Sequence, residues 1–335
     1  MLDKIGFYTL SEKRAKQASI NSNLMRCELI ITEKCNFHCL YCRGLSNDAN
    51  RTLSKDEIMS DLSLWTNDNL ENIRFSGGEP TLHKDLEDSV KFCANNGIKR
   101  IAISTNGFMP QKKYDTLLSA GVNDFSISLD ACCSSIGDMM AGGKTGSWKR
   151  VVDNIRYLSS VSYVSVGIVV TDDNMSQAIE TVIFAHELGV SDIRIIPAAQ
   201  YMRENTKSLE SIPDEILNAH PILKYRVNRA ILGHSVRGIS KMDANKCGIV
   251  LDDSVIAGSH HYPCVIYLRE GGKPIGKVGS GMRKERFNWH IKHNTHRDSI
   301  CKNNCLDVCI DYNNQFKKYH VYSGMAKNND IENIW

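Results

Sequence analysis

Three cysteines near the start of the chain have a spacing that suits metal chemistry. Cys35, Cys39 and Cys42 stand within eight residues of one another. Three thiolates can hold three irons of a cubane cluster and leave the fourth iron open, and an open coordination position separates a reactive metal site from a structural one. A structural zinc at the same place would need a fourth ligand, for which His38 is the candidate.

A second group of cysteines lies toward the C-terminus and comprises Cys247, Cys264, Cys301, Cys305 and Cys309. Twelve cysteines in a chain without a secretory signal pattern indicate metal binding rather than cross-links, because a reducing compartment disfavours disulfides. A spacing of four puts either 301 with 305 or 305 with 309 on one helix face. The sequence leaves open which of these three closes the site.

Composition excludes several classes of protein. The net charge is +3, far from the dense basic character of a protein that grips a long nucleic acid, so nucleic acid is not expected as a partner. No apolar run reaches the roughly 20 residues that a membrane span requires. We therefore expect a cytoplasmic protein with no membrane partner, and its 42% hydrophobic content is enough for a packed core.

Predicted strands and helices alternate along the part of the chain that must position the first cysteines. Short β-branched runs predict strands at 27–31, 72–75, 100–104, 124–128, 164–170 and 192–196. Amphipathic segments predict helices at 55–65, 84–96, 112–119, 148–159 and 175–188. Right-handed crossovers would curl six such units into an α/β fold, a partial (β/α)6 TIM-like barrel. The first cysteine loop follows the first strand, at the C-terminal mouth where barrel enzymes keep their chemistry.

The chain is predicted to divide into five parts. An N-terminal extension covers 1–25 and the barrel covers 26–197. Residues 198–245 are expected to form a linker that covers the barrel mouth. Residues 246–320 are expected to form a small cysteine-rich domain with hairpin-like pieces near Gly271 and Gly272, stapled by metal, and a tail covers 321–335.

The C-x3-C-x2-C spacing, with the aromatic Tyr41 before the last cysteine, resembles the radical S-adenosylmethionine (SAM) superfamily. The resemblance implies a [4Fe-4S] cluster on the three cysteines and SAM as cofactor. Gly77, Gly78 and Glu79 resemble the GGE motif that holds the amino group of SAM, although glycines after a strand are often only a turn. Further residues resemble contacts to the SAM ribose and carboxylate, with capping or surface roles as the alternatives: Ser104, Asn106, Ser128, Asp130 and Arg194.

The same resemblance implies a mechanism. SAM is cleaved reductively to a 5'-deoxyadenosyl radical, which abstracts a hydrogen atom from the substrate, with electrons from a flavodoxin or ferredoxin-type donor. Cys132 and Cys133 follow the fourth predicted strand near the same mouth and are candidate catalytic thiols that return a hydrogen atom to a substrate radical. The alternative is that both are small core residues.

The C-terminal cysteines resemble the Twitch and SPASM domains of this superfamily, which implies one auxiliary [4Fe-4S] cluster. The chain departs from the family pattern, because it closes with C-x3-C-x3-C where the family uses C-x2-C. A structural zinc is one alternative, and a cluster with an open iron that binds substrate is another. The basic and aromatic stretch 283–293 either meets a phosphate or acidic substrate or forms a solvated face.

These features favour an oxidoreductase with a small-molecule substrate such as a sugar, aminocyclitol or nucleotide. The main alternative is a peptide- or protein-modifying maturase that forms thioether or carbon-carbon crosslinks. A zinc-binding nucleic-acid module is a distant third, against which the glycine motif and the barrel pattern speak.

Overall fold

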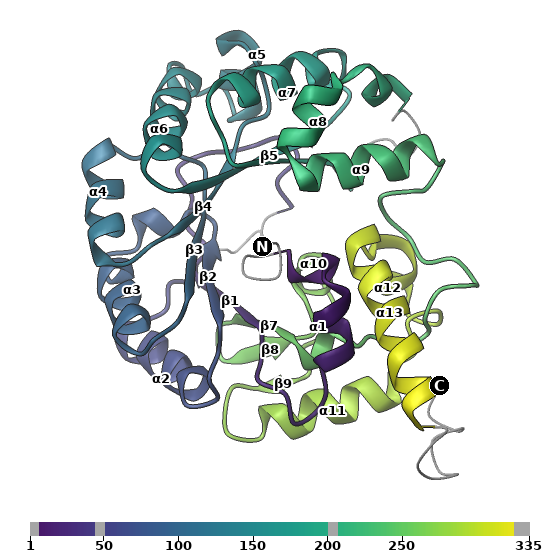
Figure 1. Ribbon diagram of the computed structural model, residues 1–335. Coiled ribbons are helices and arrows are strands. Elements are labelled where there is room, and N and C mark those ends of the chain that lie inside the picture. Colours follow the sequence, from purple (N-terminus) through teal and green to yellow (C-terminus); the bar gives the residue numbers. More distant parts are fainter. Residues whose placement is uncertain (1–6, 44–50, 200–206, 325–335) are drawn as a thin grey trace.

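The computed structural model describes residues 7–43, 51–199 and 207–324. Six parallel strands stand in chain order from the middle of the sheet to one edge, which confirms the predicted barrel strands. In Figure 1 they curve around a common interior with helices on the outside. The strands are β1 (Arg26–Thr32), β2 (Asn72–Gly77), β3 (Arg100–Thr105), β4 (Asp124–Ser128), β5 (Tyr163–Val170) and β6 (Asp192–Pro197).

The two faces of this sheet differ in chemistry because side chains alternate along each strand. One face carries buried apolar side chains such as Leu29 and Phe125, which belong to the main hydrophobic core. The other face is polar: Arg74 Nη1 donates to Ser104 Oγ at 3.0 Å, and Arg194 of β6 reaches past β5 to donate to the hydroxyl of Ser126 in β4. The barrel interior therefore suits a polar ligand.

The five predicted helices are present, each after its strand and outside the sheet (Figure 1). The first begins at a capping box in which Ser54 and Glu57 satisfy each other's backbone amides. An extra short helix, α5, precedes α6. The outer helices are α2 (Lys55–Thr66), α3 (Leu86–Asn95), α4 (Gln111–Ala120), α5 (Ser134–Met140), α6 (Ser147–Val161) and α7 (Ala178–Glu187).

The segment predicted as a linker over the mouth instead supplies the sixth barrel helix. After a short 3-10 turn come α8 (Asp214–Ala219) and α9 (Pro221–Ile231), and α9 packs along β6. Its buried stripe includes Leu223 and Val227, and the amide of Ile222 donates to the carboxylate of Asp192 at the start of β6. The segment packs against the barrel because its apolar side chains recur at helical spacing and form one face that is buried against β6. Residues 200–206 of the predicted linker lie outside the described part.

The cysteine-rich region extends the same sheet. Strand β7 (Asp253–Ala257) pairs in parallel with β1, followed by antiparallel β8 (His260–Tyr262) and β9 (Gly276–Lys277). The β7–β8 hairpin turns at Gly258, whose φ is +62°. Gly271 and Gly272 follow helix α10 (Val265–Arg269) in the longer connection between the antiparallel strands β8 and β9. Helices α11 (Met282–Lys292), α12 (Ser299–Asn304) and α13 (Asp307–Gly324) complete the fold.

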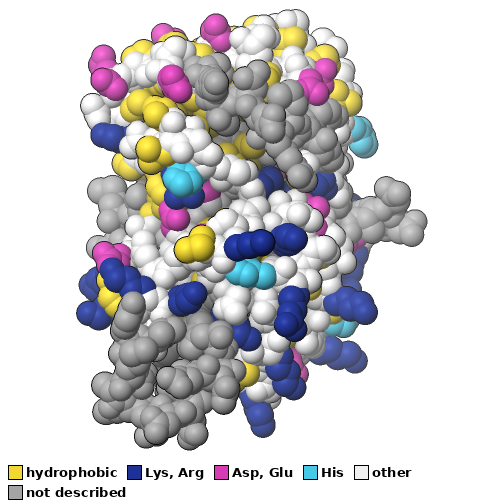
Figure 2. All heavy atoms as spheres, turned by 90° about the vertical axis from the view of Figure 1, so that its right-hand side faces the viewer, with side chains coloured by type: hydrophobic (Ala, Val, Ile, Leu, Met, Phe, Trp, Pro, Cys, Tyr) yellow, Lys and Arg dark blue, Asp and Glu magenta, His cyan; other side chains and the backbone are white. Residues whose placement is uncertain are grey.

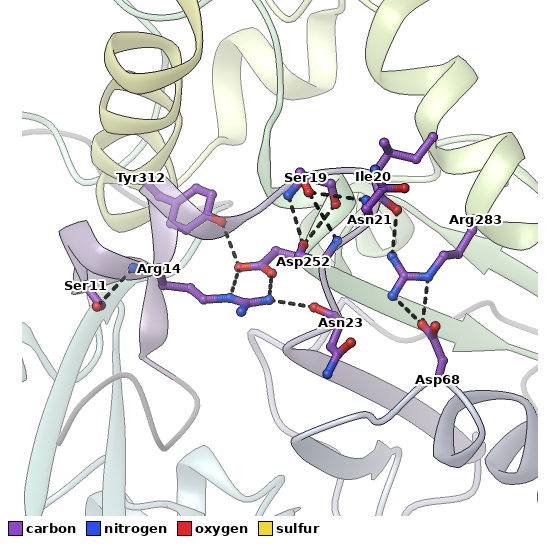
Figure 3. Close-up of polar contacts among 11 residues, drawn as sticks. Ser11, Arg14, Ser19, Ile20, Asn21, Asn23, Asp68, Asp252, Arg283 and Tyr312 are labelled. Atoms are coloured by element: carbon purple, nitrogen blue, oxygen red, sulfur yellow. Dashed lines mark hydrogen bonds and ion pairs between the residues drawn. The ribbon is translucent and has the colours of Figure 1, made fainter. Parts of the chain in front are cut away.

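The N-terminal extension is also tied into this unit. Helix α1 (Glu12–Gln17) lies between the sheet and α13 (Figure 1). Arg14 forms an ion pair with the buried carboxylate of Asp252, to which the hydroxyl of Tyr312 donates at 2.7 Å (Figure 3). Nearby, Arg283 of α11 pairs with Asp68 (Figure 3). Helices α1 and α13 therefore pack together beside the start of β7.

No helix in the described ranges combines the length and apolar character that a bilayer span demands.

Candidate active site and auxiliary metal centre

The first three cysteines lie on the loop that leaves β1 at the mouth of the barrel. Cys35 and Cys42 are exposed and Cys39 is half-buried. The pKa of Cys39 is raised to about 12, chiefly by burial, then by Asp130 and by the other two thiols. The thiols are therefore near enough to act on one another electrostatically.

The spacing of these sulfurs distinguishes a cluster from a zinc ion. Thiolates on one tetrahedral zinc at about 2.3 Å lie about 3.8 Å apart. Among the described residues, only His293, Asp298 and Cys301 bring three potential ligand atoms within 4.8 Å of one another, so the triplet and His38 do not form a compact zinc site. Three thiols on one loop that act on one another suit three corners of a cubane with one iron left free.

Neighbouring loops hold the cysteine loop in place. The hydroxyl of Tyr41 donates to the carboxylate of Asp130, just after β4, at 2.6 Å. The amide of His38 donates to the carbonyl of Ala141 at 3.2 Å. At Gly142, whose φ is +86°, a Cβ atom would lie 2.6 Å from the carbonyl oxygen of His38, so this turn requires glycine. Tyr41 and Asp130, both predicted to contact SAM, thus bond each other.

The glycine motif packs directly against the start of the cysteine loop. A Cβ atom on Gly77 would lie 2.0 Å from the carbonyl oxygen of Thr32, and one on Gly78 would lie 2.4 Å from that of Lys34. The amide of Gly78 donates to Thr32 at 2.8 Å, and that of Glu79 to Lys34 at 2.8 Å. Because neither glycine has a side chain, the backbone at the end of β2 can lie in direct contact with the backbone at the start of the cysteine loop.

The side chain of Glu79 ties neighbouring segments together. It is 0% exposed, and Oε1 accepts from the Thr81 amide at 3.0 Å and the Thr105 hydroxyl at 2.8 Å, while Oε2 accepts from the Asn106 amide at 2.7 Å. Glu79 thereby positions Asn106, whose side-chain nitrogen donates to Asn36 Oδ1 at 2.7 Å, beside Cys35. Contacts of Glu79 and Asn106 with SAM stay predictions.

The remaining predicted cofactor residues line the interior or the mouth. Ser104 accepts from Arg74 inside the barrel, and Ser128 is exposed where β4 ends. Arg194 is not a surface arginine: burial lowers its pKa to about 10, and its guanidinium lies 5.5 Å from the ring centre of Phe7. Ser104, Ser128 and Arg194 stay predictions as SAM contacts.

Cys132 and Cys133 lie between the loops that follow β4 and β5. Their sulfurs lie 3.8 and 3.5 Å from Oε1 of Gln177. A hydrogen bond with Ser135 lowers the pKa of Cys133, whereas burial raises that of Cys132. Neither is a core residue, because both are half-buried, but their role as hydrogen donors stays a prediction.

The five C-terminal cysteines converge from separate elements. The pKa of Cys305 is raised by burial and then by the charges of all four others, which are Cys309, Cys247, Cys264 and Cys301. Cys264 precedes α10, Cys301 lies in α12, Cys305 ends α12 and Cys309 lies in α13. The helix breaks between 304 and 307, so the predicted placement of Cys305 and Cys309 on one helix face was wrong. The turn brings both thiols inward instead.

Sequence reasoning missed His293 as a neighbour of this centre. Its Nε2 lies 3.5 Å from Sγ of Cys301, and its ring stacks on Trp289 with 3.9 Å between centres. A cavity of about 410 Å³ opens beside it, lined by Ile275, Glu285, Asn288, Trp289, Lys292 and His293. The sequence feature that could have indicated His293 is its position at the end of the basic and aromatic stretch, eight residues before Cys301.

The stretch 283–293 forms α11 and is largely structural. Arg286 is 2% exposed and donates to the carbonyl oxygens of Val250 and Tyr262, each at 2.9 Å. A buried guanidinium committed to backbone carbonyls joins α11 to the sheet edge. The prediction of a wholly solvated basic face was wrong for this residue, while Lys284 and Lys292 are exposed.

A parallel barrel with three thiols on the loop at its mouth and five more beside its edge is the arrangement of an iron–sulfur enzyme with an open cluster. Residues 29–185 match the Radical SAM superfamily, so this part of the chain is a radical SAM domain. It therefore binds a [4Fe-4S] cluster and SAM. Like other members it is an enzyme.

Comparisons with individual proteins agree. The chain is 28% identical over 287 residues to a probable GTP 3',8-cyclase of Methanococcus vannielii, covering 82% of this chain and 95% of that protein. The fold resembles Streptococcus suis SuiB bound to S-adenosylmethionine, with a TM-score of 0.59, 16% identity and coverage of 81% of this chain and 66% of that one. It also resembles anSMEcpe with bound AdoMet and the Cp18Cys peptide, with a TM-score of 0.58, 14% identity and coverage of 92% and 99%.

Proposed function

We propose that the protein is a radical SAM oxidoreductase that acts on a small polar molecule such as a sugar, aminocyclitol or nucleotide. The observation that carries the proposal is the pairing of two cysteine sites in one fold: an open loop of three thiols at the barrel mouth and a convergent group of five at the sheet edge. The first site generates the radical, and the second takes part in the oxidation of the substrate.

The chain's residues have separate tasks at the first site. Cys35, Cys39 and Cys42 hold the cluster. With SAM, the bound cluster supplies a one-electron cleavage that gives a hydrogen-abstracting 5'-deoxyadenosyl radical. The pair Tyr41 and Asp130 fixes the loop, and the surrounding β-strand ends orient SAM and exclude water.

The second site would hold one auxiliary [4Fe-4S] cluster. Cys247 precedes the β7–β8 hairpin and Cys264 follows it, and two of Cys301, Cys305 and Cys309 complete four ligands. Burial and mutual repulsion raise the pKa of these thiols, so they release protons when metal binds. A cluster held by these thiols would supply an acceptor for the second electron of the substrate, so that loss of this electron and a proton from the substrate radical would make the net reaction a dehydrogenation.

Two observations support a small-molecule substrate. The barrel interior is polar, with Arg74 and Arg194 bonded to serine hydroxyls. The relative that covers most of the chain is named for a reaction of GTP, a nucleotide. A peptide-modifying reaction is the alternative, because anSMEcpe, similar in fold over 92% of this chain, binds a peptide.

An electron donor must also reach the first cluster. We propose an acidic flavodoxin or ferredoxin-type protein. Figure 2 shows lysine and arginine side chains gathered on the part of the surface that the C-terminal helices form, while acidic side chains lie mainly at the other end. Such a face would attract an acidic partner at a rate that falls with added salt.

The test of the proposed function is anaerobic incubation of reconstituted protein with SAM, dithionite and candidate substrates. Formation of 5'-deoxyadenosine together with a loss of two mass units from a small molecule is expected. Mass loss only from a peptide would support the maturase, and a colourless, zinc-loaded protein purified without oxygen would end the radical assignment.

The catalytic role of Cys132 and Cys133 needs a separate test. In the Cys132→Ala and Cys133→Ala variants, SAM cleavage should persist while substrate turnover falls in the one that supplies the hydrogen atom. Unchanged turnover in both variants and in the double variant would remove the hydrogen-donor role.

A further inference from the structure

A group of arginines lies where the two cysteine regions meet. Arg43 directly follows Cys42 and forms an ion pair with Glu270, and both side chains are about four-fifths buried. Glu270 ends α10, the helix that begins after Cys264. The pair therefore links the loop of the first cluster to the region of the second.

A second arginine reaches this place from the opposite side. The amide of Gly238 donates to the carbonyl of Cys305 at 2.9 Å, which holds the adjacent Arg237 against the second cysteine region. Its Nη1 donates to the carbonyl of Asn304 at 3.4 Å, whereas its buried Nε has no hydrogen-bond partner among the described residues. Burial, followed by the charge of Arg43, lowers the pKa of Arg237 to about 10.

The charges here do not balance. Arg226 pairs with Asp307 at 3.1 Å behind Arg237, and Arg43 pairs with Glu270. Arg237 and the exposed Arg269, whose charge acts on Arg43, lack carboxylate partners within the described ranges. Asp307 also lies near Arg229, which pairs with Asp311, so these carboxylates are already shared. Arg237 is half-buried, and a half-buried positive charge without a counter-ion is costly, so this place favours an anion.

We propose that Arg43, Arg237 and Arg269 bind a phosphate group of the substrate between the two cysteine regions. This inference rests on the proposed function and narrows its substrate to a phosphorylated small molecule. Planar guanidinium forks match phosphate oxygens in paired hydrogen bonds. The site holds one end of the substrate so that the other end faces the radical.

Binding of inorganic phosphate to the anaerobically reconstituted holoenzyme tests this directly. Titration calorimetry at low ionic strength should show one phosphate per chain in the wild type. Arg237→Gln and Arg269→Gln should each weaken phosphate about tenfold or more, because each removes a charge-assisted contact. Arg237→Lys keeps the charge but loses the fork, and it should fall between wild type and Arg237→Gln.

The matched control is Arg156→Gln, which removes an arginine that is 61% exposed on the outer helix α6. It should leave phosphate affinity unchanged. Iron content shows whether each variant keeps its fold and clusters, and Arg269→Gln, at an exposed position, tests the site without threatening either.

Three results would overturn the inference: equal loss in Arg156→Gln, full affinity in both site variants, or succinate bound as tightly as phosphate, which would indicate a carboxylate site. The titration needs no turnover. A protein that forms no 5'-deoxyadenosine but binds phosphate through these arginines would therefore sink the proposed function and leave the phosphate site standing.

Discussion

The two cysteine regions of this protein are built in opposite ways. The first is an exposed loop of three thiols, pinned at Tyr41 and by close glycine packing. The second gathers five half-buried thiols from a hairpin and three helices, next to buried ion pairs that join distant parts of the chain. A metal on an open loop can exchange one of its ligands. A metal held by residues from several separate elements instead stabilises the fold that brings these elements together.

The largest expected effect is a difference in the free energy of unfolding between cysteine variants of the two regions. Cys264→Ala and Cys42→Ala should each lose about half of the iron, but only Cys264→Ala should unfold much more easily, by several kcal/mol, because structural metal sites contribute up to about 10 kcal/mol to folding. Cys264 also accepts from the amide of Tyr267 at the start of α10, whereas Cys42 is exposed. Iron analysis and urea unfolding of the anaerobic proteins measure both effects. Equal stability of the two variants would break the comparison.

The next effect concerns the ion pair that ties the N-terminal helix to the second region. In Arg14→Gln the buried carboxylate of Asp252 loses its counter-charge, which should cost about 3 kcal/mol of unfolding free energy. Lys91→Gln removes the partner of Glu87 from an exposed pair on α3 and should leave the free energy of unfolding nearly unchanged. Denaturant unfolding of the two variants compares them. A similar small cost for both would show that the N-terminal tie is unimportant.

A smaller effect is expected at the first loop. Tyr41→Phe removes the hydroxyl that donates to Asp130 and should cost about 1 kcal/mol, the net worth of one hydrogen bond. Because the loop is held at few points, the variant should also lose iron from the first site faster under a chelator. Tyr157→Phe removes a comparable bond to Asp115 on the helix layer and is the control, with unchanged iron retention. Equal iron loss in both variants would argue against the tie.

The smallest effect is in the pH dependence of stability. Burial raises the pKa of Asp130 from 3.8 to about 6, so the folded state holds this proton more tightly than the unfolded chain. The stabilising contribution is complete below about pH 3.8 and is lost as the pH rises through about 6. Asp130→Asn should flatten unfolding free energy over this window. An unchanged slope would show that Asp130 titrates normally.

Local signals made most of the barrel predictable. β-branched runs and cap residues such as Ser54 located the strands and helices, because those signals act within a few residues. The hydrogen bonds of Glu79 were not predictable, since its partners Thr105 and Asn106 lie where another strand, β3, ends. Likewise, no local pattern showed that Asp253 begins a strand beside β1, or that Arg237 meets Arg43, because only the fold brings them together.

Formation of 5'-deoxyadenosine by two cysteine variants tests the central claim, that the two regions divide radical generation from later chemistry. Anaerobic Cys42→Ala with SAM and dithionite should form none. Cys264→Ala, at a temperature where it stays folded, should still form it, within about tenfold of wild type, since SAM cleavage depends on the first cluster alone. Loss of 5'-deoxyadenosine in folded Cys264→Ala, or its persistence in Cys42→Ala, would contradict the division.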